Sequence, residues 1–492
     1  DFNFNGSLAF DRQLPNFNFD ANVKNLNLQA LNLSKDISKI AGHLVIQGEG
    51  NTLNSLLGKI TGDSVRIMRN DTLYDLGKVT FIAEQTKGKN RKLDFSSEIV
   101  NLNLQGIYNL NTVVEDIQYL VKSNFPYHTR TLGLKATALQ NTQNFTFDAE
   151  LFEARKLFGL IGLKNLDLYH FKAKGAVNTD RKELSFVSNL PLLKVNDLVF
   201  HNVQLMANNT GTTGDFLLHL DSAVVSGKKL NAIEVQSVMS GNDVQFKIDA
   251  SKIVDSIQNL QLTGTLSPHE KGYSVSITDN DIRLFQKRWK INNESKFSFG
   301  NKFIDLENVT ITDGVRLLEI GDIMNKGLAV NVVKLDVASI NPIIKYDKIL
   351  MGGELNSTLK VSDIFNASPS ITGTVHIPSL LMNNDSYGEL TIDVGKEEGK
   401  PMEVLLSLSR ATDGMALKLN GEYNFDTKRL DAEVKGKKVS LKFLEYILKA
   451  GIRDVKGYVD IDADINGKLP DIKIDGKGKA FAGQLEVIYL GE

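Results

Sequence analysis

The sequence contains no cysteine, which excludes disulfide bonds, thiolate zinc sites and cysteine nucleophiles together. This absence is typical of many bacterial envelope proteins. No stretch approaches the roughly 18 apolar residues of a membrane-spanning helix. Neither charge sign dominates, since 57 Lys and Arg face 59 Asp and Glu, so we expect no nucleic-acid partner.

Signs of catalytic chemistry are also missing. The 7 histidines are dispersed, and none has the spacing of a zinc motif. No Gly-x-Ser-x-Gly elbow and no Walker-type phosphate loop occur. We therefore expect no enzyme, no cofactor and no metal site. The remaining composition, 24% charged and 42% hydrophobic, is ordinary for a folded chain of 492 residues.

What the sequence does contain is nearly continuous alternation of apolar and polar residues. "NFTFDAEL" (144–151), "DVQFKIDA" (243–250) and "MALKLNGEYNFD" (415–426) each place an apolar residue at every second position. Period two is typical of strands with one dry and one wet face, as in antiparallel sheets. Short turns rich in Gly, Asn, Asp and Lys separate them, at 86–92, 178–182, 240–243, 395–400 and 426–428. We expect an all-β antiparallel meander.

One stretch, "VDIDADINGKLPDI" (459–472), has a second reading as a calcium loop. An EF-hand loop beginning at Asp462 would place Pro470 at position 9 and Lys473 at position 12, where a bidentate Glu is required. The strict alternation of Val, Ile and Ala with Asp and Asn fits a strand instead. We predict a strand and no calcium site.

Helical patterns are few and short. "TVVEDIQYLVKS" (112–123) opens with Thr112 and has Glu115 three residues later, the pattern of a capping box. "SLKFLEYILKAG" (440–451) ends in glycine, and the patterns over 250–260 and 339–350 are weaker. Each is interpreted as a short amphipathic helix packed on a sheet.

Segments 335–377 and 439–478 resemble one another. Both run from a short apolar helix through glycine into a strand, a turn with proline and a second strand, and 31–50 is a shorter version. A recurring unit favours an extended array over one globule. We interpret 1–492 as one continuous repetitive segment of a longer protein, without a domain boundary that the sequence defines.

The unit near the end of the chain resembles the repeat of the TamB/AsmA-like family, the translocation and assembly module proteins. The family pattern is matched by Gly457, Gly467, Leu469, Pro470, Ile472, Gly476, Gly478 and the apolar run 485–489. The resemblance implies a long antiparallel meander curled into a U-shaped β-groove. It also implies phospholipid transport across the periplasm between two bacterial membranes, and support for outer-membrane protein assembly. The implied partners are phospholipid acyl chains and an outer-membrane β-barrel, with an inner-membrane anchor on the full-length protein.

In this interpretation, alternating apolar residues line the groove and bind lipid by burial alone. The candidate lining residues are Phe145, Phe147, Leu218, Leu220, Val244, Phe246, Ile248, Phe297, Phe299, Val404, Leu406, Leu408, Leu417, Leu419, Val459, Ile461, Ile465 and Ile472. An empty groove exposing about 3,000 Å² would cost on the order of 75 kcal/mol, so it must be narrow, partly collapsed or filled.

Other architectures share this alternation. Tandem β-sandwiches or a β-solenoid would give a structural or adhesive surface protein without a lipid role, and the same residues would then be ordinary core. A transmembrane barrel is a third reading, which the predicted helices fit poorly. The sequence leaves open which lipid is carried, in which direction, and whether the sheet closes on itself.

Overall fold

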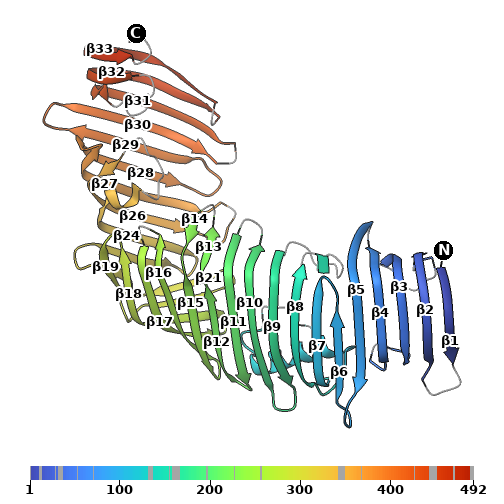
Figure 1. The fold of residues 1–492 in the computed structure, drawn as a ribbon. Coiled ribbons are helices and arrows are strands. Elements are labelled where there is room, and N and C mark those ends of the chain that lie inside the picture. Colours follow the sequence, from blue (N-terminus) through green and yellow to red (C-terminus); the bar gives the residue numbers. More distant parts are fainter. Residues whose placement is uncertain are drawn as a thin grey trace. The chain divides into compact units, whose positions relative to one another are not determined.

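The structure of the chain is a computed structural model. It describes the sequence apart from residues 1, 10–13, 28, 31–36, 53, 70, 131–133, 135–136, 154–155, 158–166, 196–197, 226–227, 255–256, 342–349, 367, 426, 443–451, 469–470 and 488–492. The chain divides into two compact units, Asp1–Pro268 and His269–Glu492. The described residues form 33 β-strands, the helix α1 (Val113–Asn124) and the short 3₁₀ helix η1 (Val337–Ile340) (Figure 1).

The first unit is built on strands that follow one another along the sheet. Its strands are β1 (Phe2–Ala9), β2 (Asn16–Asn27), β3 (Ile37–Glu49), β4 (Leu57–Arg69), β5 (Thr72–Gln85), β6 (Arg91–Ser96), β7 (Val100–Ile107), β8 (Asn144–Glu153), β9 (Asp167–Asn178), β10 (Glu183–Val195), β11 (Leu198–Thr210), β12 (Thr213–Leu220), β13 (Ser222–Val225), β14 (Lys228–Leu230), β15 (Ile233–Ser240), β16 (Asp243–Val254) and β17 (Ile257–His269).

The second unit continues in the same manner. Its strands are β18 (Gly272–Leu284), β19 (Lys287–Ile291), β20 (Lys296–Gly300), β21 (Phe303–Glu307), β22 (Val309–Thr312), β23 (Leu317–Ile323), β24 (Gly327–Asp336), β25 (Met351–Gly352), β26 (Glu354–Ser362), β27 (Ser370–Met382), β28 (Asp385–Lys396), β29 (Met402–Arg410), β30 (Met415–Asn424), β31 (Arg429–Ser440), β32 (Ile452–Lys468) and β33 (Asp471–Val487).

Pairing within each unit is antiparallel and mostly between chain neighbours. In the first unit β7 pairs with β8, β8 with β9, and β9 with β10. The exceptions to neighbour pairing come from short hairpins. β13 and β14 form a hairpin that pairs with the start of β11, and β12 therefore pairs with β15. In the second unit β28 to β33 pair in strict succession. The predicted all-β antiparallel meander is confirmed.

The turns and the strand at 459–468 agree with the sequence analysis. In the part of the chain that the structure describes, the predicted hairpin turns lie where one strand ends and the next begins, for example between β5 and β6 and between β15 and β16. Gly88 and Gly241 in these two turns have φ of 64°, which favours glycine. The aspartates of "VDIDADINGK" lie on β32, so the strand reading is confirmed.

The helix predictions had mixed outcomes. The helix predicted over 112–123 is confirmed as α1, but its capping box is wrong, since the Thr112 side chain makes no capping bond. The weak helix over 250–260 is also wrong, because Ala250 pairs with Leu260 in the ladder between β16 and β17. A short apolar run fits both the helical period of about 3.6 residues and the strand period of two, and here the cross-strand pairing shows that it is a strand. Of 339–350 and 440–451, residues 342–349 and 443–451 lie outside the described residues.

Candidate functional site

The first unit carries a face made of apolar side chains, called here the first apolar face. It consists of every second residue of β8 to β12 and β15 to β17. The register places Leu218 opposite Val235 and Val235 opposite Ile248, so side chains from successive strands lie side by side on it. All the lining residues predicted in this unit lie on this face, namely Phe145, Phe147, Leu218, Leu220, Val244, Phe246 and Ile248.

Burial on this face is uneven. One margin is closed by a cluster of buried residues, Leu151, Leu168, Leu190, Val203, Leu220 and Ala223. In the middle, Phe216 is 42% exposed, although it lies on the same face of β12 as Leu218. The sequence analysis missed Phe216, and its signal was the alternation Phe216, Leu218, Leu220 in "DFLLHL".

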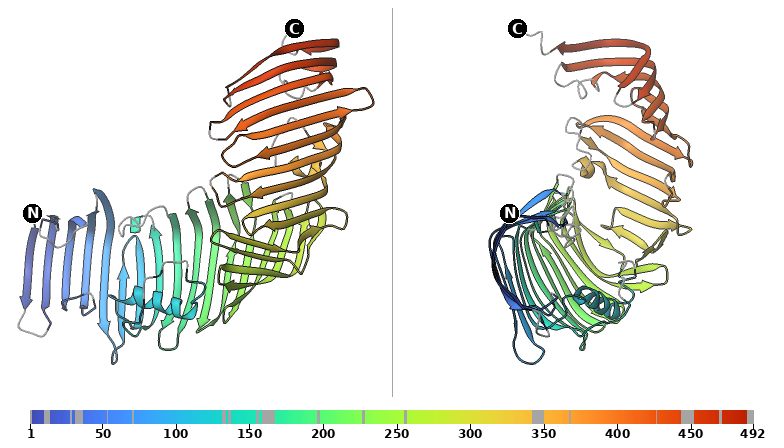
Figure 2. Two further views of the ribbon diagram at one scale, coloured as in Figure 1. Left: turned by 180° about the vertical axis from the view of Figure 1, so that it is seen from behind. Right: turned by 90° about the vertical axis from the view of Figure 1, so that its right-hand side faces the viewer.

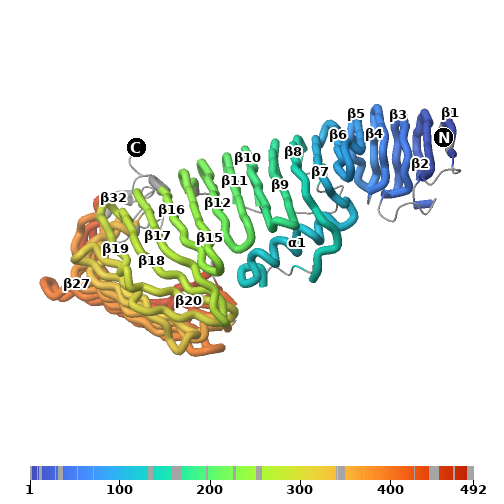
Figure 3. The backbone as a smooth tube through the Cα atoms, turned by 90° about the horizontal axis from the view of Figure 1, so that it is seen from below, coloured from blue at the N-terminus to red at the C-terminus, as the bar shows by residue number. Residues whose placement is uncertain are grey.

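Helix α1 covers another part of the first apolar face. Leu120, which is 2% exposed, packs with Phe145 and Val177, and Val113 and Ile117 pack against the same cluster. Figures 2 and 3 show α1 lying against one face of the strands of the first unit. The apolar side of α1 thus covers the apolar side chains of β6 to β10 and shields them from water. The structure consequently places the candidate lining residue Phe145 beneath α1, at 5% exposure.

A buried carboxylate attaches the start of α1. The side chain of Asp116 has no exposed surface and accepts hydrogen bonds from Thr112 Oγ1, Gln143 Nε2 and the backbone N–H of Gln140, each at 2.7 Å. The Asn141 backbone N–H adds a longer bond of 3.3 Å. Burial raises the pKa of Asp116, but these hydrogen bonds outweigh it and hold the pKa below its ordinary value. The charge is stabilised by directed donors rather than by a counter-charge. We call this group the Asp116 clasp.

Asn124 attaches the other end of α1. It is 1% exposed, and its Nδ2 donates to Asn209 Oδ1 at 2.6 Å and to the Lys182 carbonyl at 3.0 Å. Asn209 is the residue of β11 that faces the helix, where an apolar side chain would fit the pattern of the sheet. Polar groups at both ends therefore fix where α1 lies.

The second unit has a corresponding second apolar face on β28 to β33. Leu406 lies opposite Leu419, and Leu408 lies opposite Leu417. Through Gly436 on β31, Ile461 on β32 belongs to the row of Leu408 and Leu417. Ile465 belongs to the row of Val404, through Ala432 and Gly421. Leu408 is 5% exposed, inside a cluster that includes Val337 of η1 at 1%. The candidate lining residues on this face are Val404, Leu406, Leu408, Leu417, Leu419, Val459, Ile461, Ile465 and Ile472.

Other candidate residues of this unit lie elsewhere or at a margin. Phe297 and Phe299 lie on β20, opposite Val275 and Tyr273 of β18, and Phe299 is 45% exposed. Ile472 on β33 is 41% exposed. Phe297 and Phe299 are thus not neighbours of the residues on β28 to β33 in the register.

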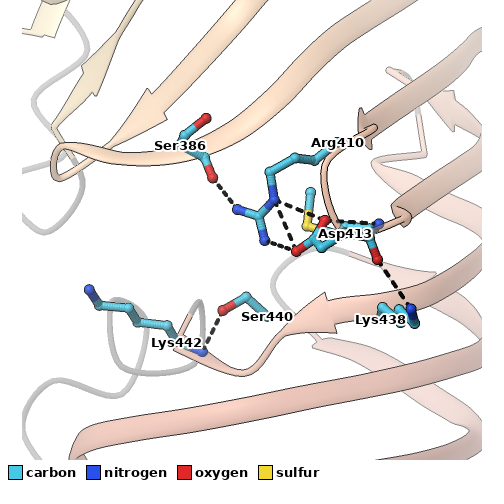
Figure 4. Close-up of polar contacts among 7 residues, drawn as sticks. Ser386, Arg410, Asp413, Lys438, Ser440 and Lys442 are labelled. Atoms are coloured by element: carbon cyan, nitrogen blue, oxygen red, sulfur yellow. Dashed lines mark hydrogen bonds and ion pairs between the residues drawn. The ribbon is translucent and has the colours of Figure 1, made fainter.

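A polar group braces the β29–β30 turn of the second unit. The Arg410 guanidinium binds Asp413 Oδ2 at 2.6 Å and also donates to the Ser386 carbonyl, while Lys438 Nζ donates to the Asp413 carbonyl at 3.2 Å (Figure 4). The Arg410 hydrogen bond holds the pKa of Asp413 below its usual range. Met415, the next strand residue, is 1% exposed. The group fixes the turn rather than presenting a reactive site.

Three of the described histidines on the polar face lie beside acids, and His219 lies beside two acids, Asp221 and Glu234. His43 Nε2 lies 2.7 Å from Asp20, and His376 Nε2 lies 2.8 Å from Glu389. Among the described residues, no group of three or more potential ligands is arranged to hold a metal ion. In the same part of the chain, no helix combines the length and apolar character needed to cross a membrane.

A hollow of about 720 Å³ lies where β7 to β11 end near the β5–β6 turn. Its lining is rich in amide and hydroxyl side chains, including Asn144, Asn178 and Asn208. These residues belong to the polar face of the sheet. The hollow therefore does not coincide with the open part of the first apolar face.

No family model matches the chain, and no curated protein or solved structure matches it either. The resemblance to the TamB/AsmA-like family therefore stays a prediction that depends on the residues quoted for it.

Proposed function

We propose that this chain binds the hydrocarbon chains of phospholipids on its apolar faces and passes them along the sheet. In this proposal the sheet forms the floor of a U-shaped groove in the periplasm of a Gram-negative-type bacterium. The full-length protein is anchored in the inner membrane, contacts an outer-membrane β-barrel partner and supports outer-membrane assembly. It acts without cofactor or catalysis.

The observation that carries the proposal is the continuity of the first apolar face together with its partial exposure. Rows of apolar side chains cross β8 to β12 and β15 to β17 without a gap in the pairing, and Phe216 remains 42% exposed. Apolar surface left in water costs about 25 cal/mol per Å², which favours an apolar occupant.

The chemistry of the face favours a hydrocarbon chain over a peptide. The backbone groups beneath the face are paired in the sheet ladder, as between β12 and β15. A peptide lying on it would bring N–H and C=O groups that find no partners, at a cost of about 1–3 kcal/mol each. An acyl chain has no such groups and contributes only apolar burial.

Photo-crosslinking with lipid detection by mass spectrometry tests the proposal. A photoreactive residue replaces Phe216 on the apolar face or, as the matched control, the adjacent Leu217 on the polar face, in chain expressed in a bacterial periplasm. We expect phospholipid adducts at 216 and none at 217. Phe246 and Lys247 on β16 provide a second pair of the same kind.

The other outcomes identify the competing architectures. Adducts at both positions would indicate that the strand is embedded in a membrane. A folded protein with no adduct at position 216 or 246 would overturn the proposal. The apolar faces would then pack on protein, as in a structural or adhesive array of β-sandwiches.

A further inference from the structure

One row of the first apolar face alternates phenylalanine with small residues. Following the register from strand to strand, Phe147 lies opposite Gly175, which lies opposite Phe186. The row then continues through Ala207, Phe216, Ser237, Phe246 and Gly264 on β11, β12, β15, β16 and β17. We call it the Phe–small row. Every second strand contributes a ring and every strand between them contributes almost no side chain.

The rows on either side are different. From β11 to β16, one neighbouring row contains Leu205, Leu218, Val235 and Ile248, with no small residue between these branched side chains. On β8 to β10 the same row consists of small residues. The other neighbouring row runs through Leu184, Asn209, Gly214, Met239 and Val244, so it contains large apolar side chains on β15 and β16 but not on β11 and β12. The Phe–small row is therefore bordered by larger side chains on both sides along β15 to β17, where Ser237 lies. Along β8 to β10 and on β12, one of its two borders consists of a small residue, such as Ser188 or Gly214.

A small residue opposite a phenylalanine leaves space for the aromatic ring to lie flat against the sheet, as Phe147 does over Gly175. A Cβ atom added to Gly175 would come within 2.6 and 2.7 Å of Phe147 Cε1 and Cζ, so the Phe147 ring lies over the glycine. A side chain at this position would push the ring up and away from the sheet. Along β15 to β17, the same alternation makes the Phe–small row a depression between the larger side chains of its two neighbouring rows.

The length of this row suits acyl chains. Neighbouring strands are spaced at about 4.7–4.9 Å, so the row from β8 to β17 extends over roughly 34 Å. An acyl chain spans half of a hydrocarbon core of about 30 Å, so two chains fit end to end along the row. Its direction, across the strands, is also the direction in which a lipid would advance along the sheet.

From this geometry we propose that the Phe–small row is a channel one acyl chain wide that holds unbranched chains end to end, and that Gly175, Ala207 and Ser237 set its depth. The inference rests on the proposed function and adds which row binds the chain and which residues determine specificity. Apolar character alone would predict that more hydrocarbon on the face improves binding. A channel of fixed depth predicts instead that added hydrocarbon in the row weakens binding, because it fills the space that the acyl chain would occupy.

Ser237→Leu separates the two expectations. The substitution makes the face more apolar but fills the depression between Phe216 and Phe246. The matched control is Ser240→Leu, the same change on the polar face of the same strand. Ser237→Ala is the second control, because it removes the hydroxyl and keeps the depth.

The assay incubates each protein with vesicles of phosphatidylethanolamine and phosphatidylglycerol, and mass spectrometry counts the phospholipid retained per chain. We expect S237L to retain about tenfold less phospholipid, the discrimination typical of a filled apolar pocket. S240L and S237A should retain the wild-type amount. Thermal unfolding checks that each variant is folded, and Ala207→Leu repeats the test two strands away if S237L does not fold.

Two results would overturn the inference or its basis, and they are distinguishable. If the wild type retains phospholipid and both S237L and A207L retain as much or more, the row does not set the depth of a channel. If the wild type itself retains no phospholipid, the proposed function fails.

Discussion

Phe145 and Phe216 are the same residue type on the same face of one sheet, and their surroundings differ. Phe145 is 5% exposed beneath α1, whereas Phe216 is 42% exposed where no described segment covers it. Both lie on strands of the same alternating pattern. The difference is made by a single helix and the polar groups that hold it, so the apolar face has a structural part and an available part.

The largest expected effect separates these two phenylalanines directly. Phe145→Ala should lower the free energy of unfolding by about 3–5 kcal/mol, because it removes a buried ring and leaves a cavity beneath α1. Phe216→Ala should cost about 1 kcal/mol, since much of that ring is already in water. Urea unfolding of both variants measures the difference. Equal losses would show that the open part is covered in solution.

A smaller effect is expected from the Asp116 clasp. Asp116→Ala leaves the Gln143 amide and the Gln140 backbone N–H without their acceptor, at a cost of about 2–3 kcal/mol. Hydrogen exchange should accelerate over residues 112–124 more than over β8. The neighbouring Glu115 is exposed on the same helix, and Glu115→Ala should change stability by about 0.5 kcal/mol or less. Protection of α1 that is unchanged in Asp116→Ala would contradict this role of the clasp.

The smallest effect concerns the Arg410–Asp413 pair, the polar brace of the second unit. Its side chains are 21% and 28% exposed, so Arg410→Ala should cost about 1 kcal/mol or less at neutral pH. Because the folded-state pKa of Asp413 is lowered, this contribution is complete above the unfolded-state pKa and is lost as pH falls through the folded-state pKa.

The wild type and Arg410→Ala should therefore converge in stability in acid, as measured by urea unfolding at a series of pH values. Arg429→Ala is the matched control, because its pair with Asp431 is more exposed, at 61% and 49%. A pH-independent difference between Arg410→Ala and the wild type would show that Arg410 acts through packing alone.

The strands and their faces could be predicted from the sequence because side-chain direction follows from period two alone. Phe246 and Lys247 lie on opposite faces of β16, as the pattern requires. At 250–260 the spacing of the apolar residues fits a helix as well as a strand, so the sequence alone did not distinguish them. The pairing of β16 with β17 shows that the segment is a strand.

The features that separate the two parts of the face could not be predicted, because they depend on residues far apart in the chain. Asp116 meets Gln143, and Asn124 meets Asn209, 85 positions later. The Phe–small row likewise exists only in the register that joins Phe147 to Gly264 through the intervening strands. The alternation of apolar and polar residues shows which side chains share a face, but only the cross-strand register shows which of them lie next to each other in one row.

The pairing of chain neighbours has a consequence for how the molecule acquires its structure. When each hairpin pairs with the one before it, as from β28 to β33, most native contacts close short loops. Short loops are closed at a small entropic cost, and contacts that are local in sequence favour rapid folding. Such a sheet can nucleate at one hairpin and grow by one strand at a time, while the rest of the chain is still being delivered.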